Sequence, residues 1–123
     1  MKHVLLLVLF VSTLGAAVAD DCADPSKTIE RIEKMTSCYE AATLARECAF
    51  GSSLDIQIAG AAGDVCVKET RKMTPADQKL LGTMQARCSK AYARRIGSLY
   101  RSMHSFCNLS ALEFINGVVT GAE

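Results

Sequence analysis

The sequence predicts an all-α fold, a small disulfide-stapled bundle of three to four helices that follows a cleaved signal peptide. Three observations lead to this prediction. An apolar N-terminal segment precedes all six cysteines. After it, apolar residues recur at helical spacing, and residues that cap helices stand before several of these stretches. A short exported chain often uses disulfides to supplement a small core.

The first residues have the composition of a secretory signal peptide. A basic start at Lys2 is followed by an apolar run over residues 4–14 and by small residues at Ala17 and Ala19. We therefore expect a signal peptide over residues 1–19 and a single helical domain over residues 20–123. The alternative, a membrane anchor, needs about 20 apolar residues, which is more than this run supplies. The predicted location is secreted, or periplasmic in a bacterium.

The cysteines predict a disulfide framework. Their number is even and all lie in the exported part of the chain, so three disulfides are expected, formed by Cys22, Cys38, Cys48, Cys66, Cys88 and Cys107. The alternative is metal binding, but no C-x-x-C pair occurs, and His104 is the one histidine after the signal. We expect no metal and no cofactor.

The first two helices are predicted on either side of a short turn. Asp24 before Pro25 is a favourable helix start, and no breaker follows until Gly51, so one helix is expected over residues 25–50. A second helix is expected over residues 54–72. Its first residues alternate in polarity, so a strand there is the alternative. Gly60 and Gly63 weaken this helix, so we expect close packing or a disulfide to compensate for them.

The third helix has the clearest start in the chain. Thr74 is a capping residue, Pro75 suits the first helical position, and Asp77 completes a capping box. Helical spacing of apolar residues persists to Cys107, but a helix of that length would measure about 50 Å, which is long for so small a domain. We therefore expect a break near Gly97. A second capping-box pattern, Ser110 with Glu113, predicts a short terminal helix over residues 111–119.

Helix geometry also suggests how the cysteines pair. In a hairpin that turns near Ser52, Cys38 and Cys66 lie equally far from the turn and are expected to form a disulfide. If the third helix rises from Pro75 by the usual distance per residue, Cys88 reaches about the level of Cys48. Cys48–Cys88 is therefore the next predicted pair. Cys22–Cys107 then follows by elimination.

Catalytic machinery is not evident in the sequence. His104 has Ser102 and Ser105 beside it, but neighbours on a helix point about 100° apart, and no acid is marked to orient the imidazole. The small residues around Gly60 lack the G-K-[ST] ending of a phosphate loop and the spacing of the membrane-helix motif. We therefore expect a protein without enzymatic activity.

A basic face is the most distinctive surface feature. If the third helix stays in phase, five basic residues fall within about a quarter of its circumference. A face exposed to solvent is the plainer explanation, but these residues are also candidates for binding a partner. They are Lys79, Arg87, Lys90, Arg94 and Arg101. The expected partner is a protein or another anionic surface. Overall charge is balanced after the signal is removed, so no nucleic acid is expected. No membrane span is expected after signal cleavage. Asn108 begins a glycosylation sequon.

The signal peptide, "DC" at the mature start and "TPADQKLLGTMQARCSKAYARR" resemble the LprI-type lysozyme-inhibitor domains of exported bacterial proteins. The resemblance spans roughly residues 22–107. This chain has Cys88 where those domains carry a tryptophan, and Ala93 separates its tyrosine from arginine. The resemblance implies a helical protein that binds a lysozyme and has no catalysis of its own.

A carrier of an apolar ligand is the alternative function. Several methionines and large apolar residues at helical spacing would line its internal cavity: Met35, Met84, Leu99, Met103 and Phe106. The same spacing also fits an ordinary core.

Overall fold

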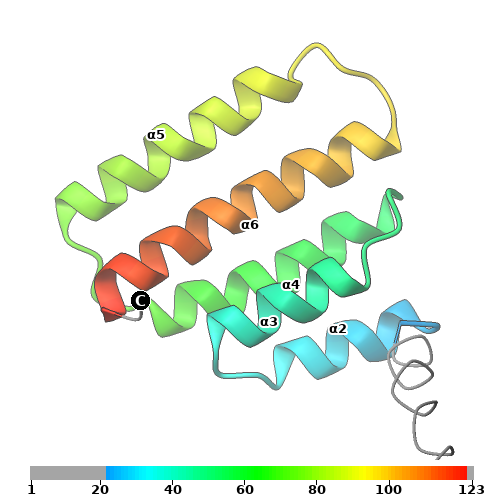
Figure 1. Ribbon diagram of the computed structural model, residues 1–123, viewed down its shortest axis with the longest axis horizontal. Helices are drawn as coiled ribbons and strands as arrows, with labels where there is room; N and C mark the ends of the chain where they lie inside the picture. Colours follow the sequence, from blue (N-terminus) through cyan, green and yellow to red (C-terminus); the bar gives the residue numbers. More distant parts are fainter. Residues whose placement is uncertain (1–21, 122–123) are drawn as a thin grey trace, which may run out of the picture.

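A computed structural model describes residues 22–121 of the chain, so the predicted signal peptide lies outside the described residues. Five helices form this part of the molecule, and no strand occurs within it (Figure 1). They are α2 (Pro25–Glu33), α3 (Cys38–Glu47), α4 (Leu54–Glu69), α5 (Pro75–Tyr92) and α6 (Ser98–Thr120). The all-α, disulfide-stapled fold is confirmed, with five helices in place of three to four.

The single helix predicted over residues 25–50 is wrong, because the chain breaks between α2 and α3. Ser37 caps the start of α3 by accepting a hydrogen bond from the Glu40 amide at 3.3 Å. The Cys38 amide donates to the Glu69 carboxylate at the end of α4, at 2.8 Å. The break allows both short helices to pack against α4.

Helix α4 confirms the helix prediction over the strand alternative, and it ends at Glu69, slightly before the predicted residue 72. Gly63 marks a close approach of α4 to α6, since the Leu112 Cδ1 atom lies 3.3 Å from the point that a Cβ atom on Gly63 would occupy. Gly60 has open space beside it. Close packing therefore explains one of the two glycines.

The predicted start of α5 is confirmed, with both hydrogen bonds of the Thr74–Asp77 capping box in place. Gly97, which has a φ of +121°, precedes α6, and the predicted break near Gly97 is confirmed. The chain also reverses direction there, which was not predicted (Figure 1). The separate helix predicted over residues 111–119 is wrong, because α6 runs unbroken from Ser98 to Thr120. Ser110 lies in the middle of α6 and donates to the Phe106 carbonyl oxygen at 2.9 Å instead of capping.

One apolar core lies among α2, α3, α4 and α6. Its largest buried side chains are Ile32, Ile58, Val65 and Leu109, and many of the remaining positions are alanine. Helix α5 stands outside this core, because it packs against α6 as its one substantial neighbour and buries a single residue, Cys88. Figure 1 shows α5 along one edge of the molecule, with α6 between it and the other helices.

Three disulfides hold the helices together. Cys38–Cys66 is confirmed, with Cα atoms 4.3 Å apart. The predicted pairs Cys48–Cys88 and Cys22–Cys107 are wrong. The structure has Cys22–Cys48, which joins the segment before α2 to the end of α3, and Cys88–Cys107, which joins α5 to α6.

The error in pairing comes from the placement of α5. We expected α5 to lie beside α3, with Cys88 level with Cys48, but α6 occupies that position. Around the reversal at Gly97, Cys88 and Cys107 are nearly equidistant from the turn. The argument that predicted Cys38–Cys66 across the first hairpin therefore also accounts for Cys88–Cys107 across the second.

Candidate functional site

The α5–α6 hairpin carries a one-sided charge. Between Asp77 and Glu113 the chain has no aspartate or glutamate, but it has six basic residues, all exposed: Lys79, Arg87, Lys90, Arg94, Arg95 and Arg101. We call residues 78–112 the cationic hairpin. Five of the six were predicted as binding residues and Arg95 was not. The absence of acids over this stretch is the sequence signal that would have identified the whole hairpin.

The structure divides the predicted basic face into two groups. Lys79, Arg87 and Lys90 lie on α5, on the side of the helix away from Cys88. Arg94 lies in the turn after α5, and Arg101 lies on α6. Since the helix does not continue in phase through residues 93–97, Arg101 does not share a helix face with the residues on α5.

Arg95 helps to form the turn itself. Its guanidinium lies over the Tyr100 ring, 5.2 Å from the ring centroid, and one of its nitrogens lies 3.5 Å from the Tyr100 hydroxyl. A guanidinium over an aromatic face is an attractive contact that keeps its charge at the surface. Arg95 is therefore held in the turn near Arg94 and Arg101.

An exposed apolar stripe runs along α6. We call this the α6 stripe. Its large apolar side chains are Leu99 (53 % exposed), Met103 (42 %), Phe114 (53 %) and Val118 (53 %). At 100° per residue they fall on one side of the helix together with Ser110. A row of large apolar side chains that remains this exposed is typical of an interaction surface.

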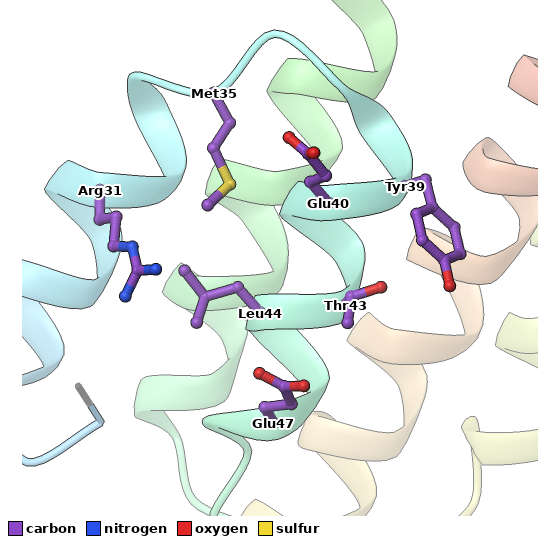
Figure 2. Close-up of a pocket in the computed structure, with 7 residues that line it drawn as sticks. All are labelled: Arg31, Met35, Tyr39, Glu40, Thr43, Leu44 and Glu47. Atoms are coloured by element: carbon purple, nitrogen blue, oxygen red, sulfur yellow. The ribbon is translucent and has the colours of Figure 1, made fainter. Parts of the chain in front are cut away.

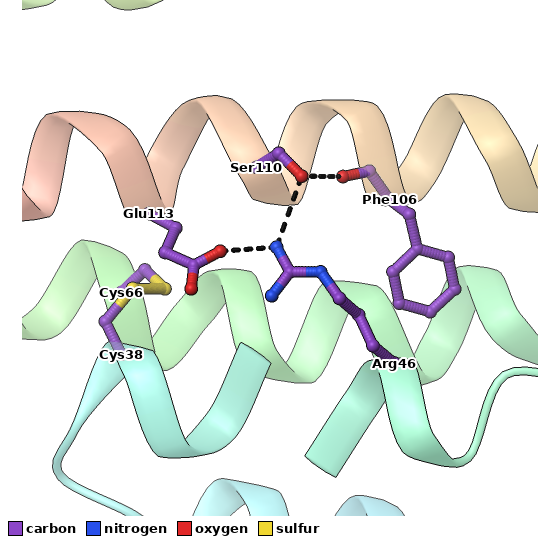
Figure 3. A network of polar contacts seen from close by, with 6 residues as sticks. All are labelled: Cys38, Arg46, Cys66, Phe106, Ser110 and Glu113. Atoms are coloured by element: carbon purple, nitrogen blue, oxygen red, sulfur yellow. Dashed lines mark hydrogen bonds and ion pairs between the residues drawn. A yellow bond between two sulfur atoms is a disulfide. The ribbon is translucent and has the colours of Figure 1, made fainter. Parts of the chain in front are cut away.

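The α6 stripe lies toward α3, as the contacts of Arg46 show (Figure 3). This side chain crosses from α3 to α6, where its guanidinium donates to the Ser110 hydroxyl at 3.2 Å and forms an ion pair with Glu113. Glu113 is the first acid after the cationic hairpin. The ion pair therefore neutralises the acid that ends the hairpin and ties α3 to α6 beside the stripe.

A buried carboxylate fixes the start of α6 on the other helices. Asp55, at the beginning of α4, is fully buried and accepts hydrogen bonds from the amides of Phe50, Gly51 and Ser52 at 2.7–3.3 Å. The Ser102 hydroxyl of α6 also donates to it, at 2.5 Å. Burial by itself raises the pKa of Asp55, but these four hydrogen bonds together lower the pKa below its ordinary value.

A second polar network fixes the far end of α6. The Asn116 amide donates to the Glu69 carboxylate at 3.0 Å and to the Thr70 hydroxyl at 2.9 Å. Glu69 also accepts from the Cys38 amide, and Cys38 is joined to Cys66. The side of α6 away from α5 is thus anchored at both ends, which makes α6 a firm support for α5.

His104 is half-buried between α5 and α6 and is not arranged for catalysis. Its Nε2 atom lies 3.2 Å from the Ser89 hydroxyl and 3.4 Å from the Asn108 amide nitrogen. A catalytic relay needs its two partners on different ring nitrogens, whereas both partners here contact the same one. The predicted neighbours have other partners, since Ser102 donates to Asp55 and Ser105 donates to the Arg101 carbonyl oxygen.

The sequon asparagine lies inside the hairpin. Asn108 is half-buried in the middle of α6, and its side-chain oxygen is buried without a hydrogen-bond partner. An attached glycan needs open solvent beside the asparagine. Its half-buried position in the hairpin is therefore unfavourable for a glycan.

A shallow hollow of about 380 Å³ lies on the opposite side of the molecule, on α2 and α3 (Figure 2). Charged, polar and apolar side chains line it: Arg31, Met35, Tyr39, Glu40, Thr43, Leu44 and Glu47. Of the residues predicted to line an apolar cavity, Met35 alone is among them. Leu99 and Met103 lie instead on the surface of α6.

Residues 22–121 contain no group of three or more histidine, cysteine or acidic side chains placed to hold a metal ion. Within the same range, the helices are too short or too polar to cross a bilayer. The chain matches no model of a known protein family, no curated protein and no solved structure. The resemblance to lysozyme-inhibitor domains therefore stays a prediction.

Proposed function

We propose that this chain is an exported binding protein that acts by contacting another protein through the α5–α6 hairpin, without chemistry of its own. The observation that carries the proposal is that α6 exposes the α6 stripe while residues 78–112 of the same hairpin have six basic residues and no acid. Export itself is supported by the predicted signal peptide and by three disulfides, which persist in oxidising compartments.

The charge of the hairpin favours an acidic partner. The cations on α5 are exposed, and no carboxylate in residues 78–112 offsets them. A surface of one sign raises the rate of encounter with a surface of the opposite sign, and the effect decreases with added salt. We therefore expect binding that weakens as the ionic strength rises.

The α6 stripe supplies the apolar part of such an interface. Phe114 and Val118 are each 53 % exposed, and Met103, with its flexible side chain, is 42 % exposed. Interfaces derive most of their affinity from a few large side chains that become buried, with charged residues at the rim. The stripe would supply the large apolar side chains of such an interface, and exposed cations of residues 78–112 would supply its charged residues.

An apolar carrier is the weaker alternative. A carrier encloses its ligand in an apolar cavity, but the hollow on α2 and α3 is lined by Arg31, Glu40 and Glu47 as well as by apolar residues. The described core is filled by side chains such as Ala41, Ala42 and Ala62. These features favour a surface that binds a macromolecule.

Photo-crosslinking tests the proposal. A photoreactive residue is placed at Lys90 or Phe114, with Gln57 and Lys68 on the exposed part of α4 as control positions, and the protein is irradiated in the exported fraction of its native cells. The proposal predicts one discrete protein adduct from positions 90 and 114 and none from the controls. Equal adducts from all four positions, or none from any, would contradict it.

Inhibition of lysozyme is the narrower form of the proposal, and it is supported by the sequence resemblance alone. The purified protein is added to a lysozyme that is degrading cell-wall suspensions. The resemblance predicts stoichiometric inhibition that is lost when Phe114 is changed to serine. Full lysozyme activity at a large excess of the protein removes this form but leaves a different protein partner open to the crosslinking experiment.

A further inference from the structure

One end of the bundle exposes large apolar side chains on two separate loops. Ile96, in the turn between α5 and α6, is 93 % exposed, and Phe50, in the turn between α3 and α4, is 61 % exposed. Leu54 and Leu99, beside these turns, are 41 % and 53 % exposed. Figure 1 places both turns at the same end of the molecule.

A direct contact joins the two loops. The Leu99 Cδ1 atom lies 3.3 Å from the point that a Cβ atom on Gly51 would occupy, so the first turn of α6 touches the α3–α4 turn. The Asp55 carboxylate binds the amides of that turn and the Ser102 hydroxyl of α6. The relative positions of Phe50 and Leu99 are thus fixed by packing and by a buried hydrogen-bond network.

Positive charge flanks Ile96 and Leu99. Arg94 and Arg95 directly precede Ile96, and Arg101 lies one turn into α6. Of the acids beside the α3–α4 turn, Asp55 is fully buried and has its hydrogen bonds satisfied within the protein, whereas Glu47, the last residue of α3, is exposed. Asp24 caps α2, which starts on the far side of this end from the α5–α6 turn.

We propose that this end of the bundle attaches to the surface of an anionic lipid bilayer. Ile96 and Phe50, with Leu54 and Leu99 behind them, would enter the boundary between headgroups and acyl chains. The guanidinium groups of Arg94, Arg95 and Arg101 would lie at the level of the lipid phosphates. Apolar insertion combined with basic residues at the headgroups is the general mode of peripheral attachment to anionic membranes.

The shape of this end favours a bilayer over a protein as the partner. A protein partner needs a complementary surface, and affinity concentrates in side chains that fill pockets. Here the two most exposed apolar side chains, Ile96 and Phe50, stand on two separate turns. A fluid bilayer accepts such side chains without a matching shape, and lipid phosphates pair well with guanidinium groups.

Attachment through this end leaves the other surfaces open. Helices α4, α5 and α6 extend away from the two turns, so Phe114, Val118 and Lys79 lie toward the opposite end of the molecule. That part of the proposed protein interface would therefore stand clear of the membrane. The inference goes beyond the proposed function: it shares Leu99 and the three arginines of this end with it, but it also rests on Ile96 and Phe50, which the proposed function does not use.

Vesicle co-sedimentation of the disulfide-bonded protein tests the proposal, with phosphatidylcholine vesicles compared with vesicles that also contain phosphatidylglycerol. We expect binding to the anionic vesicles only. Ile96→Ser and Phe50→Ser should each weaken it about tenfold or more, because each removes a large inserted side chain. Val67→Ser, a similarly exposed apolar residue near the far end of α4, should leave it unchanged.

The charge requirement is tested with two matched triple variants. Arg94→Gln, Arg95→Gln and Arg101→Gln together remove the cations of this end, and each is expected to contribute about fivefold to binding. Lys68→Gln, Lys72→Gln and Lys79→Gln together remove the same charge from exposed residues at the other end. The proposal predicts a large loss for the arginine triple and little change for the lysine triple.

Three results would overturn the proposal. One is the absence of binding to anionic vesicles by the native protein. Another is an equal loss in both triple variants, which would mean that only net charge matters. The third is a concentration-dependent dimer in sedimentation velocity that Ile96→Ser abolishes while vesicle binding persists, because the exposed side chain would then serve a second copy. Circular dichroism of each variant confirms that it is folded.

Discussion

The two sides of helix α6 are built differently. Toward α4, its side chains Leu109, Ser102 and Asn116 are buried in a core that four helices share, and two of them bind carboxylates directly. Toward α5, its face meets a single helix that buries only Cys88. The first side determines the fold. The second carries an added helix whose surface is little constrained by packing.

This difference explains where charge gathers. The helices that form the core carry acids and bases together, whereas residues 78–112 carry bases alone. A helix that contributes one buried residue can vary nearly all of its side chains without loss of a core contact. Helix α5 is therefore the element best suited to present a binding surface.

The largest expected effect comes from removing the disulfide of the core side. Cys38 and Cys66 are fully buried and join α3 to α4. Changing both to alanine should lower the free energy of unfolding by about 3–5 kcal/mol, as measured by urea denaturation. All five helices should lose structure in one transition. A loss confined to α3 would contradict a shared core.

Two isoleucines allow a matched comparison of the two sides. Ile58 and Ile115 are both fully buried, but Ile58 belongs to the shared core and Ile115 does not. Ile115 lies about three helical turns after His104, which contacts Ser89 of α5, so it falls on the side of α6 that faces α5. Each change to alanine removes the same atoms and should cost about 2–4 kcal/mol where the site cannot collapse.

We expect Ile58→Ala to reach the upper part of that range and Ile115→Ala the lower part, because a helix held on one side relaxes into the space more easily. Thermal denaturation of both variants measures the difference. A greater loss for Ile115→Ala would show that α5 contributes more to the core than its burial indicates.

Asp55 is the next largest contribution, and it depends on pH. Asp55→Asn should cost about 2–3 kcal/mol at neutral pH, because it removes a buried charged acceptor of four hydrogen bonds. The folded pKa is lowered relative to the unfolded chain. The stabilisation is therefore complete above the unfolded pKa of about 3.9 and is lost as the pH falls through the folded pKa.

The free energy of unfolding of the native protein and of Asp55→Asn, measured by denaturation at neutral pH and at a pH below about 4, tests this effect. The difference in unfolding free energy between the native protein and Asp55→Asn should be smaller at the acidic pH. Asp64→Asn serves as the control, since Asp64 is exposed on the same helix. A difference that stays constant with pH would mean that the ionised carboxylate is not the stabilising species.

The smallest expected effect is at the Arg46–Glu113 ion pair, which is partly exposed. A double-mutant cycle with Arg46→Ala and Glu113→Ala should give a coupling of about 0.5–1 kcal/mol, because solvent screens such pairs. The coupling should fall with added salt. A coupling above about 2 kcal/mol would indicate that the pair behaves as a buried one.

Local signals in the sequence predicted the parts of the fold that depend on local interactions. The capping box at Thr74 and Asp77 fixes the start of α5, and Gly97 supplies the backbone conformation for the break. Cys38–Cys66 follows from the geometry of one hairpin. Each of these depends on residues within one or two neighbouring elements.

The errors share a different origin. The break between α2 and α3 depends on Glu69, which is distant in sequence and binds the Cys38 amide. Ser110 and Glu113 match a capping box in sequence, but Arg46 of α3 engages both in the middle of a continuous helix. The two wrong disulfides come from placing α5 beside α3. None of these tertiary contacts has a local signature.

The candidate surfaces were predictable in part. The basic residues were identified from helical spacing, but the break at Gly97 separates Arg101 from the others. The exposure of Ile96 was not predictable, because an apolar residue is ordinarily expected in the core. Packing alone decides which apolar side chains are left outside.

Amide hydrogen exchange of the native protein and of the Cys88→Ala, Cys107→Ala double variant is the most direct test of the claim that α5 is an added helix. The Cys88–Cys107 disulfide cross-links α5 to α6. In the double variant, α5 should lose its protection while α3, α4 and α6 keep theirs. Loss of protection throughout residues 22–121 would contradict the claim, because α5 would then be part of the core.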